Sequence, residues 1–216
     1  MSTTIQEQSD ALKAASAGRL PAEVLEIFTR DQAAWRTKGH PADAVAVGDV
    51  LSDFTLPDAT GQDVSLSQLV AAGPAILVFY RGGWCPYCNL ALHQYQSELV
   101  PQLPSYGATL AAISPQKPDE SLSTAEKHDL QFPVLSDSGA HVARALGIAF
   151  EPAEDVLEAQ RALGLDIRDG NVDGSPELPM PTVIVVDSDR TVRFVDVQAD
   201  YTSRTEVSEI LAALNG

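Results

Sequence analysis

The stretch Ala75-Ile-Leu-Val-Phe-Tyr80-Arg-Gly-Gly-Trp-Cys85-Pro-Tyr-Cys88 decides the fold. Its first six residues form a continuous apolar run with the length of a central β-strand that is buried on both faces, which favours a mixed or parallel sheet covered by helices. A helix is expected to begin at Pro86, because proline suits the first helical position. Both cysteines therefore lie where the chain leaves the end of the sheet, a position that favours a functional site.

Strands and helices alternate along the rest of the chain. We expect a hairpin over 54–66, a buried strand over 108–113, helices over 86–100, 119–130 and 138–146, an extended segment over 132–135 and a hairpin over 182–197. Pro101 is expected to end the helix over 86–100, and the capping box Ser203-x-x-Glu206 is expected to start the last helix. This order predicts an α/β fold, a three-layer sandwich with a mixed sheet and helices on both faces.

Two segments lie outside this alternation. Residues 1–47 are expected to form a helical extension ahead of a domain spanning 48–216, because their apolar residues recur with a helical period. The apolar stripe favours a helix that covers its own sheet or a second copy in a homodimer, and the sequence leaves both open. Residues 152–180 are expected to form an insertion, with a helix over 153–163 and a loop over 169–176.

Composition excludes several classes of function. The chain has 216 residues, of which 44% are hydrophobic and 20% charged, with a formal net charge of −16. Such a charge repels phosphate backbones and anionic lipids, so we expect neither nucleic acid nor a membrane as a partner. The first ten residues lack the features of a secretory signal, and we expect a reducing, cytoplasmic location.

The cysteine pair carries the clearest chemical signal. With Cys85 as the N-cap of the helix, its thiolate would accept backbone N–H hydrogen bonds at the positive end of the helix dipole, which predicts a lowered pKa. Cys88 falls on the apolar face of the same helix, so Cys85 is expected to be the more exposed nucleophile. The spacing also suits a reversible dithiol–disulfide couple. We expect no metal and no cofactor, because a zinc site needs two further soft ligands and the four histidines are isolated.

Three further segments resemble one family. Asp53-Phe-Thr-Leu-Pro-Asp-Ala-Thr-Gly-Gln-Asp-Val-Ser-Leu66, Val78-Phe-Tyr80 and Phe132-Pro-Val-Leu-Ser-Asp137 resemble signature segments of the peroxiredoxins of the AhpC/TSA family, within the thioredoxin-like superfamily. The resemblance covers about residues 48–214. It implies a thioredoxin-like fold, a peroxide substrate and regeneration by thioredoxin or a similar reductant.

The active-site loop departs from the family pattern. Alignment on Phe79-Tyr80 places Cys88 at the peroxide-attacking cysteine, Cys85 at the usual threonine and Arg81 at the usual proline. The peroxide-orienting arginine of the family would fall near Pro181 and is missing. The family therefore nominates Cys88 as the nucleophile, whereas the helix-cap argument nominates Cys85, and both belong to the candidate site.

The loop also resembles the thioredoxin pattern. Trp84-Cys-Pro-Tyr-Cys88 resembles Trp-Cys-x-x-Cys, and Met180-Pro181-Thr182 resembles the cis-proline segment that faces the dithiol, so we expect a cis bond before Pro181. Trp84, Pro86 and Tyr87 are expected to surround the thiols, with Tyr80 as a further candidate. Arg81 is expected to supply a cation that lowers a thiolate pKa.

These features predict a thiol peroxidase with a Cys85–Cys88 dithiol. The alternative is a dithiol–disulfide oxidoreductase that acts on protein or small-molecule disulfides. A third possibility is a non-enzymatic binding module that retains the fold.

Overall fold

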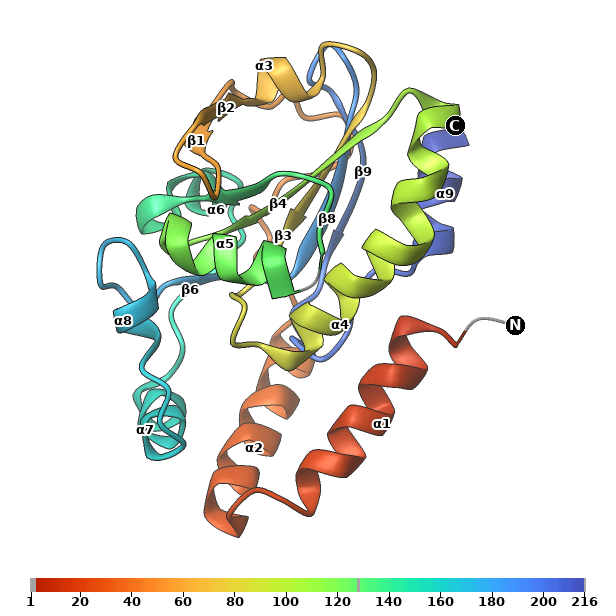
Figure 1. Ribbon diagram of the computed structural model, residues 1–216. Coiled ribbons are helices and arrows are strands. Elements are labelled where there is room, and N and C mark those ends of the chain that lie inside the picture. The colour runs from red at the N-terminus through yellow and green to blue at the C-terminus, as the bar shows by residue number, and fades with distance from the viewer. Residues whose placement is uncertain (1–2, 128, 216) are drawn as a thin grey trace.

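A mixed five-stranded sheet forms the centre of the protein (Figure 1). The computed structural model describes residues 3–127 and 129–215. The strand order is β5-β4-β3-β8-β9, in which β3, β4 and β5 are parallel and β8 and β9 are antiparallel to their neighbours. The strands are β3 (Ala75–Phe79), β4 (Thr109–Ser114), β5 (Val134–Ser136), β8 (Thr182–Val186) and β9 (Val192–Val197). The predicted mixed sheet and the hairpin at its edge are confirmed.

Helices cover both faces of this sheet because alternate side chains of the buried strands point to opposite sides. Ile76 and Val78 face the core cluster that contains α4 and α9, whereas Leu77 and Phe79 face the cluster that contains α3 and α6. The elements of the first face are α4 (Pro86–Gln94), α5 (Pro118–Lys127) and α9 (Val207–Asn215). Those of the second face are β1 (Thr55–Pro57), β2 (Asp63–Ser65), α3 (Leu66–Leu69), η3 (Ser138–Ala140) and α6 (His141–Ala145). The predicted three-layer α/β sandwich is therefore confirmed.

The helix after the cysteines continues past the predicted end at Pro101. A π-helical turn, η1 (Tyr95–Leu99), follows α4 directly, and a 3₁₀ segment, η2 (Val100–Tyr106), follows η1. Pro101 lies in the first turn of η2, where the π-helical turn changes to the 3₁₀ segment, so the proline changes the helix type without ending the helix. Gly107 ends the segment in a left-handed conformation, with φ +59°.

The N-terminal helices are α1 (Ile5–Ala17) and α2 (Ala22–Lys38). Figure 1 shows α1 beside α4, and Ile5 is fully buried in the same core cluster as the α4 side chains. The Glu206 carboxylate accepts hydrogen bonds from the backbone N–H groups of Ile5 and Gln6, at 3.0 and 2.9 Å. The expected capping box at Ser203 is therefore wrong, because α9 begins at Val207 and Glu206 caps α1 instead.

The helix α2 is tied to the segment that follows β9. Gln32 donates to the Tyr201 hydroxyl at 3.0 Å, and Arg36 donates to the Asp200 carboxylate at 2.6 Å. A third contact, the ion pair between Arg30 and Asp155, connects α2 to the insertion. The N-terminal helices thus pack on their own chain through residues that are distant in sequence.

The predicted insertion adds a short hairpin and two helices. They are β6 (Ala149–Phe150), α7 (Glu154–Ala162), α8 (Ile167–Gly170) and β7 (Leu178–Pro179). The helix predicted over 153–163 is confirmed, whereas part of the predicted loop over 169–176 belongs to α8. Buried Leu157, Ile167 and Leu178 form a small core that packs against Trp84. The insertion therefore lies beside the cysteine loop. Among the described residues, no helix has both the length and the apolar character needed to cross a membrane.

We expect Glu206→Gln to weaken the docking of α1. An anionic cap on two free N–H groups at a helix N-terminus contributes roughly 0.5–2 kcal/mol, and the neutral amide loses the charge and one acceptor. Urea unfolding should therefore give a free energy of unfolding about 1 kcal/mol below that of the wild type. Glu26→Gln, on the exposed side of α2, is the matched control, and an equal loss in both variants would contradict the capping role.

Candidate active site

The loop between β3 and α4 is held by two glycines and two amide side chains. A Cβ at Gly82 or Gly83 would collide with the Trp84 ring or with the Thr124 side chain. The Gly83 N–H donates to Gln116 Oε1 at 2.6 Å, and Asn89 donates to the Gly83 carbonyl at 2.7 Å. The loop can therefore follow this path only because two consecutive residues lack side chains.

Cys85 is the N-cap of α4, and Pro86 occupies the first helical position, as the sequence predicts. Both cysteines are free thiols, and each is only 1% exposed. The expectation that Cys85 is the more exposed thiol is therefore wrong. The reason is tertiary, because α1, α2 and the segment after β9 cover the start of α4.

Arg204 provides the cation that contacts the thiols. Its Nη2 lies 3.0 Å from the Cys88 sulfur and 3.8 Å from the Cys85 sulfur. Nη1 of the same guanidinium donates to the carbonyls of Tyr201 and Ser203, at 2.6 and 2.5 Å. These bonds fix the guanidinium in a buried position where it faces both sulfurs.

The two thiols have opposite pKa shifts. Burial raises the pKa of Cys85 well above its ordinary value, and its hydrogen bond to Cys88 raises it further. Burial also acts to raise the pKa of Cys88, but the hydrogen bond from Cys85 and the Arg204 charge outweigh it and lower that pKa. The predicted lowering at Cys85 is therefore wrong, because it considered only the helix dipole. These opposite shifts favour Cys88 over Cys85 as the thiolate of the pair.

Arg81 lies against two aromatic rings. Its guanidinium carbon is 4.2 Å from the centre of the Tyr201 ring and 5.0 Å from that of Trp84. The residue is 4% exposed, and its positive charge lowers the pKa of both cysteines, as predicted, although burial dominates at each thiol. Within the described residues, its side chain makes no hydrogen bond or ion pair, and its Nε is buried without a partner.

The thiols border different spaces. Cys85 lines a cavity of about 250 Å³ together with Trp84, Pro86 and Tyr87. Cys88 lines a much smaller space of about 10 Å³, whose other walls include Tyr80, Tyr95, Pro181 and Arg204. The structure thus brings the predicted site residues together around the two cysteines, with Tyr80 and Pro181 on the Cys88 side.

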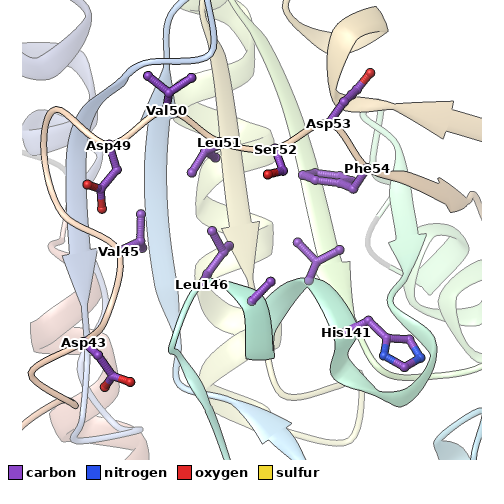
Figure 2. A pocket seen from close by; sticks show the side chains of 12 residues that line it. Asp43, Val45, Asp49, Val50, Leu51, Ser52, Asp53, Phe54, His141 and Leu146 are labelled. Atoms are coloured by element: carbon purple, nitrogen blue, oxygen red, sulfur yellow. The ribbon is translucent and has the colours of Figure 1, made fainter.

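A separate cavity of about 500 Å³ lies on the other face of the sheet (Figure 2). Figure 2 shows Phe54 and His141 at its rim, with side chains of the chain segment over 43–54 along one wall. Neither cysteine lines it. It is therefore separate from the dithiol.

The peptide bond before Pro181 is trans, since the described residues contain no cis bond. The chain enters β8 in an extended form there, with the Met180 N–H bonded to the Ile148 carbonyl and the Pro181 carbonyl bonded to the Gln198 N–H, both at 2.8 Å. The expected cis proline is wrong, and this part of the resemblance to thioredoxins no longer supports a disulfide substrate. Pro181 still lies beside Cys88.

Sequence reasoning missed Arg204 and Tyr201. The sequence comparison expects the family's arginine near Pro181, where it is missing, whereas the guanidinium that contacts the thiols comes from the segment between β9 and α9. The only signal for Arg204 is its charge, since the chain has only 14 Lys and Arg residues. Sequence spacing alone gives no reason to connect it with cysteines more than 110 residues away.

The mixed sheet, with a buried cysteine pair at the start of the helix that follows its central strand, defines an α/β protein of the thioredoxin-like fold class. The AhpC/TSA family model matches residues 47–195, so the chain belongs to the AhpC/TSA family. A predicted peroxiredoxin of Mycobacterium tuberculosis (strain ATCC 25618 / H37Rv) is 26% identical over 167 residues, which cover 77% of this chain and 94% of that protein. The thioredoxin-like fold and the peroxiredoxin relationship expected from the sequence are thus confirmed.

Two further proteins are similar to this chain. The crystal structure of peroxidoxin BcpB from Mycobacterium tuberculosis has a TM-score of 0.62 at 25% identity and covers 79% of this chain and 97% of that one. The thiol-disulfide oxidoreductase ResA of Geobacillus thermodenitrificans is 28% identical over 116 residues, 53% of this chain and 65% of that protein.

Proposed function

We propose that this protein is a thiol peroxidase in which Cys88 attacks the peroxide and Cys85 resolves the product. The observation that carries this proposal is the 3.0 Å contact between the Arg204 guanidinium and the Cys88 sulfur. A thiolate is the nucleophilic form of cysteine, and a buried cation at hydrogen-bonding distance stabilises it. The family alignment supports the same choice of sulfur.

The reaction consumes one peroxide and oxidises the dithiol by two electrons. The Cys88 thiolate attacks the terminal oxygen of R–O–O–H, the O–O bond breaks, and Cys88 becomes a sulfenic acid. The departing alkoxide takes the proton of the Cys85 thiol and leaves as an alcohol, or as water when the peroxide is H₂O₂. The Cys85 thiolate then attacks the sulfenic sulfur, forms the Cys85–Cys88 disulfide and releases hydroxide.

Cys88 is 1% exposed, so the first turn of α4 must shift before a peroxide can reach it. Cys85 borders the open cavity, and a reductant thiolate that enters there would meet the Cys85 sulfur of the disulfide first. Attack at Cys85 releases Cys88, whose lowered pKa makes it the better leaving group. A thioredoxin-type dithiol would serve as this reductant.

Rapid mixing of the fully reduced protein with H₂O₂ tests the proposal. We expect two thiols to disappear and the intact mass to fall by two hydrogens. At pH 7 the rate should exceed that of free cysteine at least about 30-fold, since an ordinary thiol is only a few per cent ionised there. Thiol loss no faster than that of free cysteine would overturn the proposal.

The dithiol–disulfide oxidoreductase remains the second candidate, because Cys85 and not Cys88 lines the cavity. The same reduced protein, mixed with a small disulfide in place of peroxide, decides between the two. Rapid reduction of the disulfide with inertness toward peroxide would favour this second function.

A further inference from the structure

The cavity beside Cys85 has an apolar side and a cationic side. Its apolar side comes from the turn before α2, from α2 and from α7, which contribute Leu20, Leu25, Phe28 and Val156. The first three of these residues precede the segment that matches the family, so that segment alone does not form this wall. The volume of about 250 Å³ lies just below the range of about 300–1,000 Å³ that is typical of small-molecule sites. The cavity therefore suits a compact ligand.

The charge of the cavity is opposite to that of the whole protein. Among the described residues that line it, the charged ones are Lys13 and Arg81, and none is Asp or Glu. The whole chain, in contrast, has 30 Asp and Glu residues against 14 Lys and Arg residues. The Cys85 thiol in the same wall is neutral at pH 7, because burial and its hydrogen bond to Cys88 raise its pKa. The cavity thus gathers positive charge in a strongly acidic protein, which favours an anion as the ligand.

Arg81 is the buried cation of the two, with 4% of its surface exposed. Its guanidinium stacks on Tyr201 and Trp84, which covers its faces but satisfies none of its N–H donors. Asp31 is a carboxylate on which the Arg81 charge acts, but burial raises the pKa of Asp31 more than that charge lowers it, and no ion pair joins the two within the described residues. Buried charged groups are nearly always paired, because an unpaired one loses its hydration without compensation. A carboxylate in the cavity would supply the acceptors that the guanidinium lacks.

We propose that this cavity binds a compact carboxylic acid with an apolar body, and that the bound acid keeps the reductant from Cys85. The carboxylate accepts hydrogen bonds from the Arg81 donors, and Lys13 adds a second positive charge. The apolar body packs on the wall that contains Phe28. The blocking effect rests on the proposed function, in which the reductant reaches Cys85 through this cavity, whereas the binding does not. Occupancy by the acid therefore slows regeneration of the dithiol.

Fluorescence titration of the reduced protein under anaerobic conditions tests the binding. In a Trp35→Phe variant, Trp84 is the only tryptophan and lines the cavity. 3-Phenylpropionate should change the Trp84 fluorescence in a saturable way. 3-Phenylpropan-1-ol has the same ring and chain without the carboxylate, so it should bind at least about tenfold more weakly, because it forms no charged hydrogen bond with Arg81. No saturable change with the acid, or equal affinities for the acid and the alcohol, would overturn the proposal.

Two substitutions in this background separate the two sides of the cavity. Arg81→Met should weaken binding of the acid at least about tenfold and leave the alcohol unchanged, because only the acid uses the guanidinium. Phe28→Ala should weaken both ligands by a similar factor, since both carry the ring. Phe54→Ala, the matched control, removes an equally half-buried ring from the cavity on the other face (Figure 2) and should change neither affinity. An unchanged affinity for the acid in both Arg81→Met and Phe28→Ala would overturn the proposed site.

Reduction of the Cys85–Cys88 disulfide by dithiothreitol tests the blocking effect. Dithiothreitol carries no carboxylate, so it does not compete for Arg81. At a concentration of 3-phenylpropionate that is about ten times its dissociation constant, only about one protein molecule in eleven is free, so the rate of reduction should fall about tenfold. An unchanged rate at a saturating concentration would overturn the blocking effect. Slow thiol loss with H₂O₂ would overturn the peroxidase proposal instead, whatever the titration shows.

Discussion

Replacing Cys88 by serine is expected to abolish peroxide reduction, whereas Cys85→Ser should still carry out the first oxidation. A serine hydroxyl stays protonated at neutral pH and no longer supplies the anion that Arg204 stabilises. In Cys85→Ser the Cys88 thiolate and its arginine remain, so one thiol should be lost quickly and the protein mass should rise by one oxygen. Intact mass after rapid mixing, with a sulfenic acid trap, measures both outcomes.

The two substitutions control for each other, because both remove one buried sulfur from the same helical turn. They should differ by several orders of magnitude in the rate of the first oxidation. Fast oxidation of Cys85 in Cys88→Ser, with an inert Cys85→Ser, would reverse the assigned roles. That result would agree with the greater access of Cys85 to the cavity.

Arg204→Met is expected to lower the peroxide rate at pH 7 by about 100-fold. Without the guanidinium, burial raises the pKa of Cys88 and leaves little thiolate at neutral pH, which accounts for about 30-fold. The remaining loss comes from the missing donor beside the reacting sulfur. The pH dependence of the rate and of the ultraviolet thiolate absorbance report this pKa directly. Arg204→Lys, which keeps the charge but not the fork of donors, should recover part of the rate.

Stability should show the same linkage with a definite sign. The folded-state pKa of Cys88 lies below its unfolded-state pKa. At a pH between these two pKa values, the unfolded chain therefore binds a proton that the native protein lacks. The stabilising contribution is fully present above the unfolded pKa of about 8.5 and is lost as pH falls through the folded pKa. The free-energy difference between wild type and Arg204→Met should therefore grow with pH in this window, by up to about 1.4 kcal/mol per pH unit. A difference independent of pH would contradict an ionised Cys88.

Much of the fold follows from local sequence signals. The apolar run over 75–80 and the segments over 108–113 and 182–197 contain the buried strands. Continuous apolar runs of this length are too short for most helices and suit strands that are buried on both faces. Pro86 and the preceding cysteine mark the start of α4, and Gly147 ends the helix that contains α6 in the left-handed conformation that glycine accepts. These signals involve only a few neighbouring residues, so they can be recognised without knowledge of the tertiary structure.

The errors arise where a distant segment changes a local preference. The helix dipole predicts an acidic Cys85, but burial under α1 and α2 raises its pKa, and Arg204 transfers the charge to Cys88. Glu206 suits a helix start nearby, yet its carboxylate caps a helix about 200 residues away. In both cases the interacting residue lies far away along the chain, so the local sequence pattern does not reveal it.

The sequence by itself determined the thioredoxin-like α/β sandwich, the place of the two cysteines at the start of a helix and the family to which the chain belongs. Only the tertiary structure decided which thiol carries the charge, because that depends on Arg204, which the turn after β9 carries to the sulfurs. It also decided that the N-terminal helices and the insertion enclose a cavity beside Cys85. Charge stabilisation and enclosure depend on distances through space, and the local spacing of residues along a chain does not encode them.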